Sequence, residues 1–424
     1  MAEDKPTRWV PSSLLLQLIL WAGVLLAAAV AFRRADLLVL GLPFIVLSTW
    51  SIATRPRSRP TVRHGLERTT PTEAERTRLI VEARGLDGAE SWTVQTDRTA
   101  RVRWDKSVTS ALADVHRIEL TWWPSRTGPV WVGGVHVQFS SPWGAYRFGA
   151  LHLPPLEARA LPRAEAFDSR TPVPHPIGLV GLHRSSRPGS GTEFADVREF
   201  RPGDRLRSVH WPLTARTGTL HSRTNYAEQD AEVHLVVDAS VDFGDRSRGT
   251  TIDTGLRAAA GISEFFLRQG DRVGLRVVGS ERPLNLRPSL GLQHHRRVLD
   301  LLSAVNPGRL GDRDASGLRW NIPSGATVVM MSPLLGQFAS TVAATLAARG
   351  LTIVVVDTLP TEPLDAVQDP GHLIAMRIRL LERQMEIDAL RRRGVPVVAW
   401  HGPGTLDDVM RRLARRPPAR AAAR

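Results

Sequence analysis

The sequence contains no cysteine, and Lys5 and Lys106 are its only lysines among 424 residues. Without thiols the chain forms no disulfide bond and offers no thiolate ligand to a metal, although this absence does not fix its compartment. Nearly all of the positive charge is therefore arginine, and it is spread along the whole chain. The formal net charge of +14 suits an anionic membrane surface or an acidic partner. No basic and aromatic module typical of nucleic-acid binding accompanies it, so we expect no nucleic-acid partner.

Two long apolar runs lie near the N-terminus, over Ser13–Phe32 and Leu37–Ala53, separated by four residues. The first is broken only by Gln17, and both are close to the about 20 residues with which a helix crosses hydrocarbon. The pair predicts a transmembrane helical hairpin within residues 1–54. A cleavable signal peptide is the alternative, and the long apolar core and the immediate second span disfavour it.

The charges around this hairpin predict its orientation. Positive residues on both outer flanks exceed the two arginines of the turn; they are Lys5, Arg8, Arg55, Arg57, Arg59 and Arg63. Because positive flanks remain on the cytoplasmic side, we expect a multi-pass protein of the cell membrane whose soluble domains are cytoplasmic. Trp9 and Trp50 lie near the ends of the runs, where indole rings favour the membrane interface.

Residues 63–165 change to short runs of alternating or β-branched residues separated by turns such as Asp87-Gly88 and Gly133-Gly134. This pattern predicts an all-β sandwich in which the tryptophans of the alternating strands belong to the core. Residues 166–190 are rich in Pro, Gly and Ser, which indicates a linker.

From residue 233 to residue 415 buried strands alternate with helices, which predicts a mainly parallel sheet with helices on both faces, an α/β doubly wound domain. The expected strands are Val233–Val237, Arg272–Val278, Leu284–Arg287, Ala326–Met331, Leu351–Val356 and Val395–Trp400. The expected helices are Thr251–Arg268, Leu292–Ala304, Phe338–Arg349, His372–Arg392 and Leu406–Leu413. Residues 416–424 are Pro, Arg and Ala, typical of a disordered tail.

Residues 191–232 carry a dense series of charged and aromatic residues, and the series continues just past the first of these strands. The series comprises Glu193-Phe194, Arg198, Phe200, Gly203-Asp204, Arg207, Trp211, Ala215-Arg216 and Asp238-Ala239-Ser240. In this order it resembles the hallmark of the bacterial family called domain of unknown function 58. The resemblance implies a von Willebrand A-like α/β domain and, as partner, a MoxR-type AAA+ ATPase that acts in assembling or maturing complexes. It implies no molecular activity.

The loop after the first α/β strand offers oxygen atoms at alternate positions, Asp238, Ser240 and Asp242. Oxygen ligands suit Mg²⁺, and the loop looks like the metal-dependent adhesion site of von Willebrand A domains. The third position is Asp242 where that site has serine, and Ser289 stands in for its threonine. The predicted metal set is therefore Asp238, Ser240, Asp242 and Ser289. Alternatively, Asp238 and Ser240 hydrogen-bond to backbone amides of their own loop.

The hallmark segment also contains the residues that we expect to contact a partner: Arg198, Asp204, Arg207, Trp211 and Arg216. Guanidinium groups pair with carboxylates of a partner, or else with carboxylates of the segment itself. The histidines lack the spacing of a zinc helix, and no phosphate-binding loop is present. We therefore expect a non-enzymatic adaptor. The alternatives are a metal-assisted hydrolase built on Asp238, Asp242 and Asp204, and an envelope structural protein.

Overall fold

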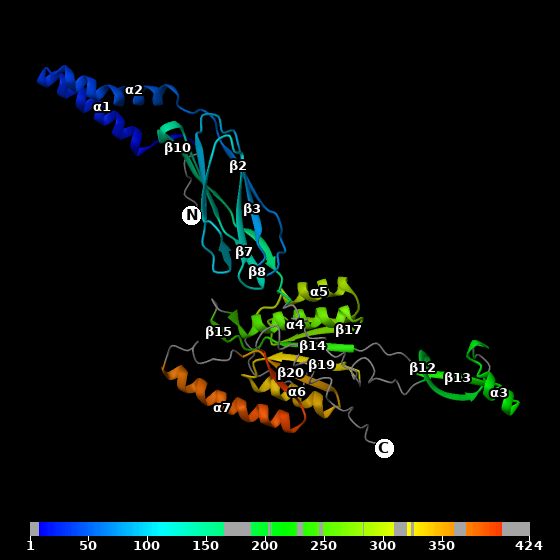
Figure 1. Ribbon diagram of the computed structural model, residues 1–424. Helices are drawn as coiled ribbons and strands as arrows, with labels where there is room; N and C mark the ends of the chain where they lie inside the picture. Colours follow the sequence, from blue (N-terminus) through cyan, green and yellow to red (C-terminus); the bar gives the residue numbers. More distant parts are fainter. Residues whose placement is uncertain are drawn as a thin grey trace. The chain divides into compact units, whose positions relative to one another are not determined.

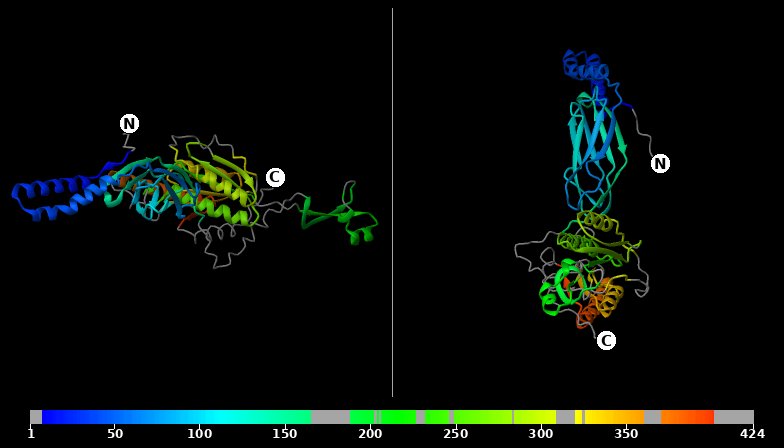
Figure 2. Two further views of the ribbon diagram at one scale, coloured as in Figure 1. Left: turned by 90° about the horizontal axis from the view of Figure 1, so that it is seen from above. Right: turned by 90° about the vertical axis from the view of Figure 1, so that its right-hand side faces the viewer.

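The computed structural model describes residues 8–164, 188–201, 204, 206–226, 232–245, 249–282, 284–308, 320–323, 326–359 and 370–400 (Figures 1 and 2). The chain divides into two compact units, Met1–Leu161 and Pro162–Arg424. Most of the predicted linker, the predicted helix Leu406–Leu413 and the predicted tail lie outside the described residues.

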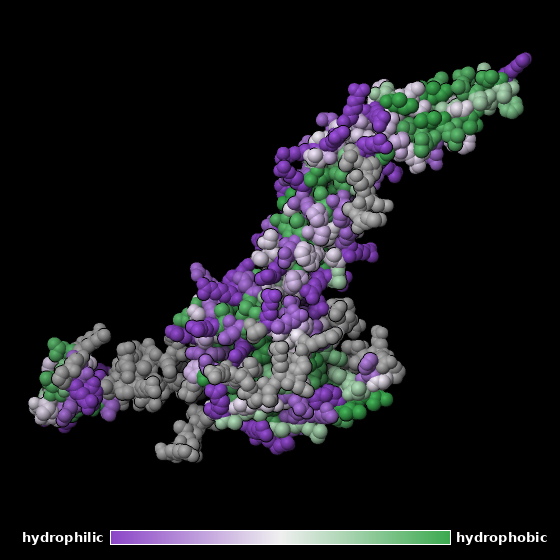
Figure 3. Space-filling view, turned by 180° about the vertical axis from the view of Figure 1, so that it is seen from behind, coloured by the Kyte–Doolittle hydropathy of each residue, from purple (hydrophilic) through white to green (hydrophobic). Residues whose placement is uncertain are grey.

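The two apolar runs form helices α1, Ser13–Phe32, and α2, Ala35–Ala53. Arg33 adopts a left-handed conformation between them, with φ 51°, so the chain reverses within two residues. The helices pack on each other, and a Cβ added at Gly41 would lie 3.2 Å from the Cβ of Leu25. Most of their apolar side chains face outward (Figure 3), and by length and composition both helices could cross a membrane.

The rest of the first unit is rich in sheet, as predicted. A five-stranded sheet has the order β1-β10-β9-β4-β6, a four-stranded sheet has the order β2-β3-β7-β5, and β11 pairs with β8. Their bounds are β1 Val10–Pro11, β2 Thr61–Leu66, β3 Thr77–Arg84, β4 Ser91–Thr96, β5 Val102–Trp104, β6 Val108–Leu112, β7 Arg117–Pro124, β8 Gly128–Val132, β9 Val135–Ser140, β10 Tyr146–Leu153 and β11 Leu156–Ala160.

One hydrophobic core joins these sheets into a sandwich. Alternate residues of β3 and β4 point into it, including the fully buried Leu79, Val81 and Trp92. Trp122 and Trp92 are core residues, as predicted for the tryptophans of this region. Trp131, in the alternating run of β8, is exposed instead, so the prediction is wrong for this side chain. Trp143, outside the alternating strands, is exposed as well.

The hallmark segment folds as a hairpin of β12, Pro188–Glu199, and β13, His221–Tyr226. Between these strands lie a short 3-10 turn, Leu206–Ser208, and helix α3, Trp211–Thr217. The Nδ1 atom of His210 accepts the amide of Leu213 at 3.3 Å, and Gly218 ends α3 with φ 72°.

The α/β region contains a mixed six-stranded sheet of order β18-β17-β14-β19-β20-β21. Its edge strand β18 is antiparallel to β17 and the other pairs are parallel, so the prediction of a mainly parallel sheet is confirmed. The bounds are β14 Glu232–Asp238, β17 Arg272–Val278, β18 Leu284–Ser289, β19 Thr327–Ser332, β20 Thr352–Asp357 and β21 Val397–Ala399.

Helices cover both faces of this sheet (Figure 1). Helices α4, Thr251–Arg268, and α5, Leu292–Leu302, pack on one face, and α6, Gln337–Ala348, and α7, Pro370–Arg392, pack on the other. Thr250 and Asp253 form a capping box that starts α4 at the predicted residue. Helix α5 ends two residues before the predicted Ala304.

Candidate functional site

The strand order brings the carboxyl ends of three central strands to one edge of the sheet. Asp238 ends β14, Ser332 ends β19 and Asp357 ends β20. The chain winds outward in opposite directions from β14, so the connections reverse between β14 and β19. In open α/β sheets the edge at such a reversal is where ligands and partners bind. The candidate site is therefore this carboxyl edge.

The carboxylate of Asp238 is the centre of the edge, and only 3% of the residue is exposed. Its Oδ1 atom accepts the backbone amide of Ser240 at 3.0 Å and the Ser240 hydroxyl at 2.5 Å. Its Oδ2 atom accepts the hydroxyl of Ser332 at 2.6 Å. The Ser332 hydroxyl in turn accepts the amide of Leu334 at 3.0 Å. Asp238 thus ties the loop after β14 to the loop after β19.

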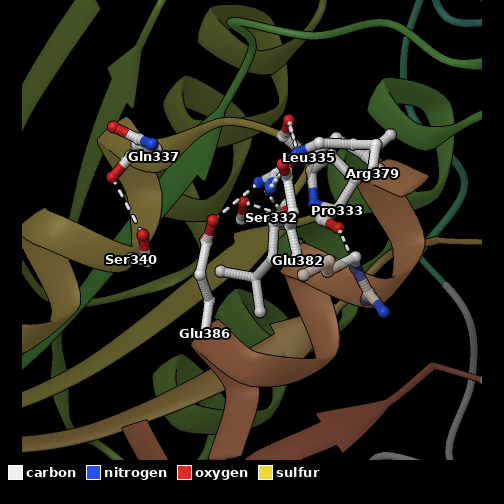
Figure 4. Close-up of polar contacts among 10 residues, drawn as sticks. Ser332, Pro333, Leu335, Gln337, Ser340, Arg379, Glu382 and Glu386 are labelled. Atoms are coloured by element: carbon white, nitrogen blue, oxygen red, sulfur yellow. Dashed lines mark hydrogen bonds and ion pairs between the residues drawn. The ribbon is translucent and has the colours of Figure 1, made fainter. Parts of the chain in front are cut away.

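Two arginines of α7 hold the loop that follows Ser332 (Figure 4). The Nε atom of Arg383 donates to the carbonyl of Pro333 at 2.8 Å, while its other end forms a buried ion pair with Asp357. The Nε atom of Arg379 donates to the carbonyl of Leu335 at 2.9 Å. Charged hydrogen bonds of this kind, largely shielded from water, fix the loop to α7.

A glycine lies next to Ser240 on the β17 side of the carboxyl edge. Gly279 follows β17 with φ 77°, and a Cβ at this position would lie 2.4 Å from the backbone nitrogen of Ser240. The amide of Ala239 donates to the carbonyl of Val278 at 2.7 Å, so the two loops run in direct contact. Both the positive φ and the close approach require glycine here.

The predicted magnesium ligands are not all brought together. Ser289 pairs with Val273 at the start of β17, whereas Asp238 pairs with Val278 at its end. Five residues of strand separate these levels, about 17 Å at about 3.3 Å per residue. Ser289 therefore lies at the opposite edge of the sheet because β18 runs antiparallel to β17, which the sequence-based placement did not take into account.

The other three predicted ligands, Asp238, Ser240 and Asp242, lie together in the loop after β14 at the carboxyl edge. Both oxygens of Asp238 already accept hydrogen bonds from donors within the protein, and Asp242 is exposed. In the described part of the chain no group of three or more His, Asp and Glu side chains could hold a metal ion. The alternative interpretation, in which Asp238 accepts a backbone amide of its own loop, agrees with the hydrogen bond from Ser240.

In the hallmark hairpin Arg198 and Asp204 bind each other rather than remaining open. The two guanidinium NH groups donate to the two carboxylate oxygens at 2.8 and 2.7 Å, and the amide of Arg201 donates to the same carboxylate at 2.8 Å. The hydrogen bond from Arg198 lowers the pKa of Asp204, and the same bond raises the pKa of Arg198. A depressed carboxyl pKa means that this pair supports the hairpin at neutral pH, and that the support is lost as the pH falls through the lowered pKa.

Other predicted partner residues are open to solvent. Trp211 begins α3 with 67% of its surface exposed, and Arg216 is exposed in the last turn of the same helix. Leu206 is exposed as well. The side chain of Arg207 lies outside the described part of the segment.

A further exposed surface, which was not predicted from the sequence, lies on α7. We call it the α7 stripe; it consists of Ile374, Ile378, Leu381 and Met385, all of them exposed. They follow each other at intervals of four, three and four residues and so share one face of the helix. Green residues gather over this part of α7 in Figure 3. The sequence signal for this surface was a second apolar face on the helix, besides the face on which Ile387 and Leu390 are buried.

Part of the chain that forms this site is similar to a known protein family. Residues 196–384, from the hallmark hairpin into α7, match the family model described as "Protein of unknown function DUF58", which confirms the predicted resemblance over this range. An uncharacterized protein of Mycobacterium tuberculosis, Rv1480, and one of Mycobacterium bovis, Mb1516, are each 32% identical to the chain over 137 residues. That stretch is 32% of this chain and 43% of each relative, so the chain spans less than half the length of the curated relatives it matches.

Removing the Ser332 hydroxyl tests whether Asp238 holds the edge together. Ser332→Ala leaves a buried carboxylate oxygen without its donor, and we expect the opening free energy of β14 and β19 to fall by about 1.5–3 kcal/mol. Hydrogen exchange followed by mass spectrometry on the full chain in detergent measures this change.

Ser340→Ala is the matched control. The Ser340 hydroxyl donates at 2.9 Å only to the Gln337 carbonyl in its own helix turn (Figure 4), so a change below about 0.5 kcal/mol is expected. Equal decreases in the opening free energy for Ser332→Ala and Ser340→Ala would show that the hydrogen bond to Asp238 does not stabilise the edge.

Proposed function

We propose that the protein is a membrane-anchored, cytoplasmic adaptor whose α/β domain, similar to von Willebrand A domains, binds another protein and transforms no substrate. The partner is a MoxR-type AAA+ ATPase, and the two act in the assembly or maturation of complexes. The observation that carries the proposal is the α7 stripe, because soluble proteins rarely leave large apolar side chains in a contiguous row without a partner.

The stripe suits a partner helix. Residues spaced by four, three and four positions form a ridge that packs into the groove of another helix. The residues most often dominant at interfaces are large side chains that become fully desolvated on binding. Leu381 and Met385 are two such side chains, and both are open to solvent.

The stripe is also coupled to the carboxyl edge. Arg379 and Arg383, on the same helix, donate hydrogen bonds to the loop after Ser332. The hydroxyl of Ser332 in turn donates to Asp238. A partner that displaces α7 therefore acts on the loops of the edge, and a partner that contacts the edge acts on α7. This coupling supports a docking face made of the loops around Asp238 together with the stripe.

The hallmark hairpin supplies the second contact. Trp211 is exposed at the start of α3 and Arg216 is exposed in its last turn. Trp and Arg are among the residue types that contribute most binding energy at interfaces. Arg198 and Asp204 pair with each other, as in the alternative in which the arginines bind carboxylates of their own segment, and the pair shapes the loop that precedes Trp211.

Helices α1 and α2 supply the anchor. Their outward apolar surfaces favour hydrocarbon, and the excess of arginine on the outer flanks favours a cytoplasmic location for everything after Arg55.

The alternative, a metal-assisted hydrolase using Asp238, Asp242 and Asp204, would require a divalent cation at these carboxylates. Calorimetry with Mg²⁺ and Mn²⁺ on the full chain in detergent distinguishes it from the adaptor. The adaptor gives no binding heat that disappears in Asp238→Ala, whereas a hydrolase gives heat that does. The second alternative, an envelope structural protein, predicts that the sandwich rather than the α/β domain captures the partner.

The docking face is tested by replacing one residue of the stripe. Leu381→Asp places a charge in the centre of the proposed contact, and we expect the affinity for the purified MoxR-type ATPase of the same bacterium to fall at least about tenfold, or ~1.4 kcal/mol. Surface-bound full-length chain in detergent, titrated with the ATPase, gives the Kd.

The matched control for this substitution is Leu292→Asp. Leu292 begins α5 on the other face of the same sheet, and both leucines are 70% exposed. Affinity retained by Leu381→Asp, or lost equally in Leu292→Asp, would contradict the docking face, and binding that depends on Trp211 alone would assign the contact to the hallmark hairpin.

A further inference from the structure

The chain between the sandwich and the first apolar helix contains no spacer. Strand β1 pairs with β10 through Val10 and Pro11, and α1 begins at Ser13. The residue between them, Ser12, is fixed on both sides: its amide donates to the carbonyl of Ala145 at 2.8 Å, and its hydroxyl accepts the amide of Leu15 at 3.3 Å. The direction of α1 is therefore set by the sandwich.

Side chains strengthen this connection. The ring of Trp9 packs on Phe148 with centroids 5.6 Å apart, and its Nε1 atom donates to the carbonyl of Ser58 at 2.9 Å. Leu15, in the first turn of α1, is 2% exposed and belongs to the core of the sandwich. The start of an apolar helix is thus part of the hydrophobic core of the β-structure.

The last residue of α2 lies close to the end of the sandwich where α1 begins. Helix α2 ends at Ala53, and the guanidinium of Arg55 lies over the ring of Tyr146, 5.7 Å from its centroid. Pro56 then contacts Gly88, where a Cβ would lie 3.1 Å from the proline Cβ. Both ends of the hairpin are therefore attached to one end of the sandwich, which carries Tyr146 and the loop before it.

That loop presents an exposed tryptophan. Trp143 lies in the 3-10 turn Pro142–Gly144 with φ 61°, and its amide donates to a carboxylate oxygen of Glu90 at 3.1 Å. Its side chain is 64% exposed, although Tyr146 and Phe148 just after it are buried. An indole ring held outward in this way is costly in water and favourable at the boundary between headgroups and hydrocarbon.

Exposed arginines surround the same end. Arg55 and Arg57 follow α2, and Arg147 lies on β10 opposite Val10. Guanidinium groups bind phosphate oxygens, and clusters of positive residues next to a membrane span are attracted to anionic lipid. The apolar spans, the exposed tryptophan and the arginines therefore gather at one end of the unit, and they suit the hydrocarbon, the boundary and the headgroups of a bilayer, respectively.

We propose that the Tyr146 end of the sandwich is a lipid-binding surface that lies directly on an anionic phospholipid bilayer. Trp143 enters the interface, and Arg55, Arg57 and Arg147 contact phosphate groups. The surface rests on the anchor of the proposed function, since α1 and α2 must span the membrane, and it adds that the sandwich stands on the bilayer rather than moving freely on a tether.

The absence of cysteine allows a direct test, because a single introduced thiol is labelled without background. Three full-length variants, Trp143→Cys, Trp131→Cys and Leu26→Cys, are labelled with bimane and reconstituted into phosphatidylglycerol-containing vesicles. Nitroxide lipids carrying the spin label at the headgroup or near the acyl-chain end then quench the fluorophore according to its depth. Trp131 is the control, since it is exposed on β8, at the end of the unit away from α1 and α2 (Figure 1).

The label at position 143 is expected to lose roughly half of its fluorescence to headgroup nitroxide and less to the deep nitroxide, as an interfacial side chain does. The label at position 131 is expected to lose none to either lipid, and the label at position 26 to lose most to the deep one. A label at position 143 that behaves as at position 131, while position 26 is quenched, overturns the lipid surface and leaves the anchor intact. A label at position 26 that no lipid quenches overturns the anchor itself.

A charge reversal tests the contribution of the arginines. Arg147→Glu, in the background labelled at position 143, is expected to reduce quenching in anionic vesicles but not in phosphatidylcholine vesicles. Arg103→Glu is the control, because Arg103 is also exposed but lies on β5, which pairs with the last residues of β7 and not with the strands next to the helices. Equal quenching in Arg147→Glu and in the unchanged background contradicts the headgroup contact.

Discussion

The α/β unit depends on the burial of one carboxylate. Asp238 is removed from water, and a buried charge is tolerated only when its oxygens are satisfied by donors. Ser240 and Ser332 provide these donors from the loops after β14 and β19. The strands that flank the reversal of the sheet are thereby joined at the edge where a partner would bind.

This constraint extends outward to α7. Ser332 starts the loop that Arg379 and Arg383 hold, and Arg383 also neutralises Asp357 at the end of β20. One face of α7 is thus engaged in polar and apolar contacts with the domain, while the α7 stripe remains open. A helix with one face committed to its own fold and another left apolar is suited to transmitting contact with a partner to the edge.

The sequence predicted most of the architecture because the relevant signals are local and periodic. The apolar run Ser13–Phe32 and the amphipathic run Thr251–Arg268 became helices with the expected bounds. What could not be predicted depends on register and direction. Ser289 was placed beside Asp238, yet the antiparallel pairing of β18 carries it to the opposite edge.

Side-chain exposure was harder to predict than secondary structure. Trp131 lies in an alternating strand like Trp92, yet its side chain is exposed, because alternation alone does not tell which face of a strand is covered. The pairing of Arg198 with Asp204 was one of two open alternatives, since spacing alone does not tell whether a carboxylate within the segment or one on a partner is closer. The hydrogen bond from Ser332 to Asp238 joins residues far apart in the chain, so no local sequence pattern predicts it.

We propose that a two-helix anchor holds a recognition module at the inner face of the membrane. Trypsin added to intact cells, with the many arginines after Arg55 as cleavage sites, tests this most directly. The region after Arg55 is expected to survive until the membrane is permeabilised and then to be digested. Digestion of that region in intact cells would contradict it.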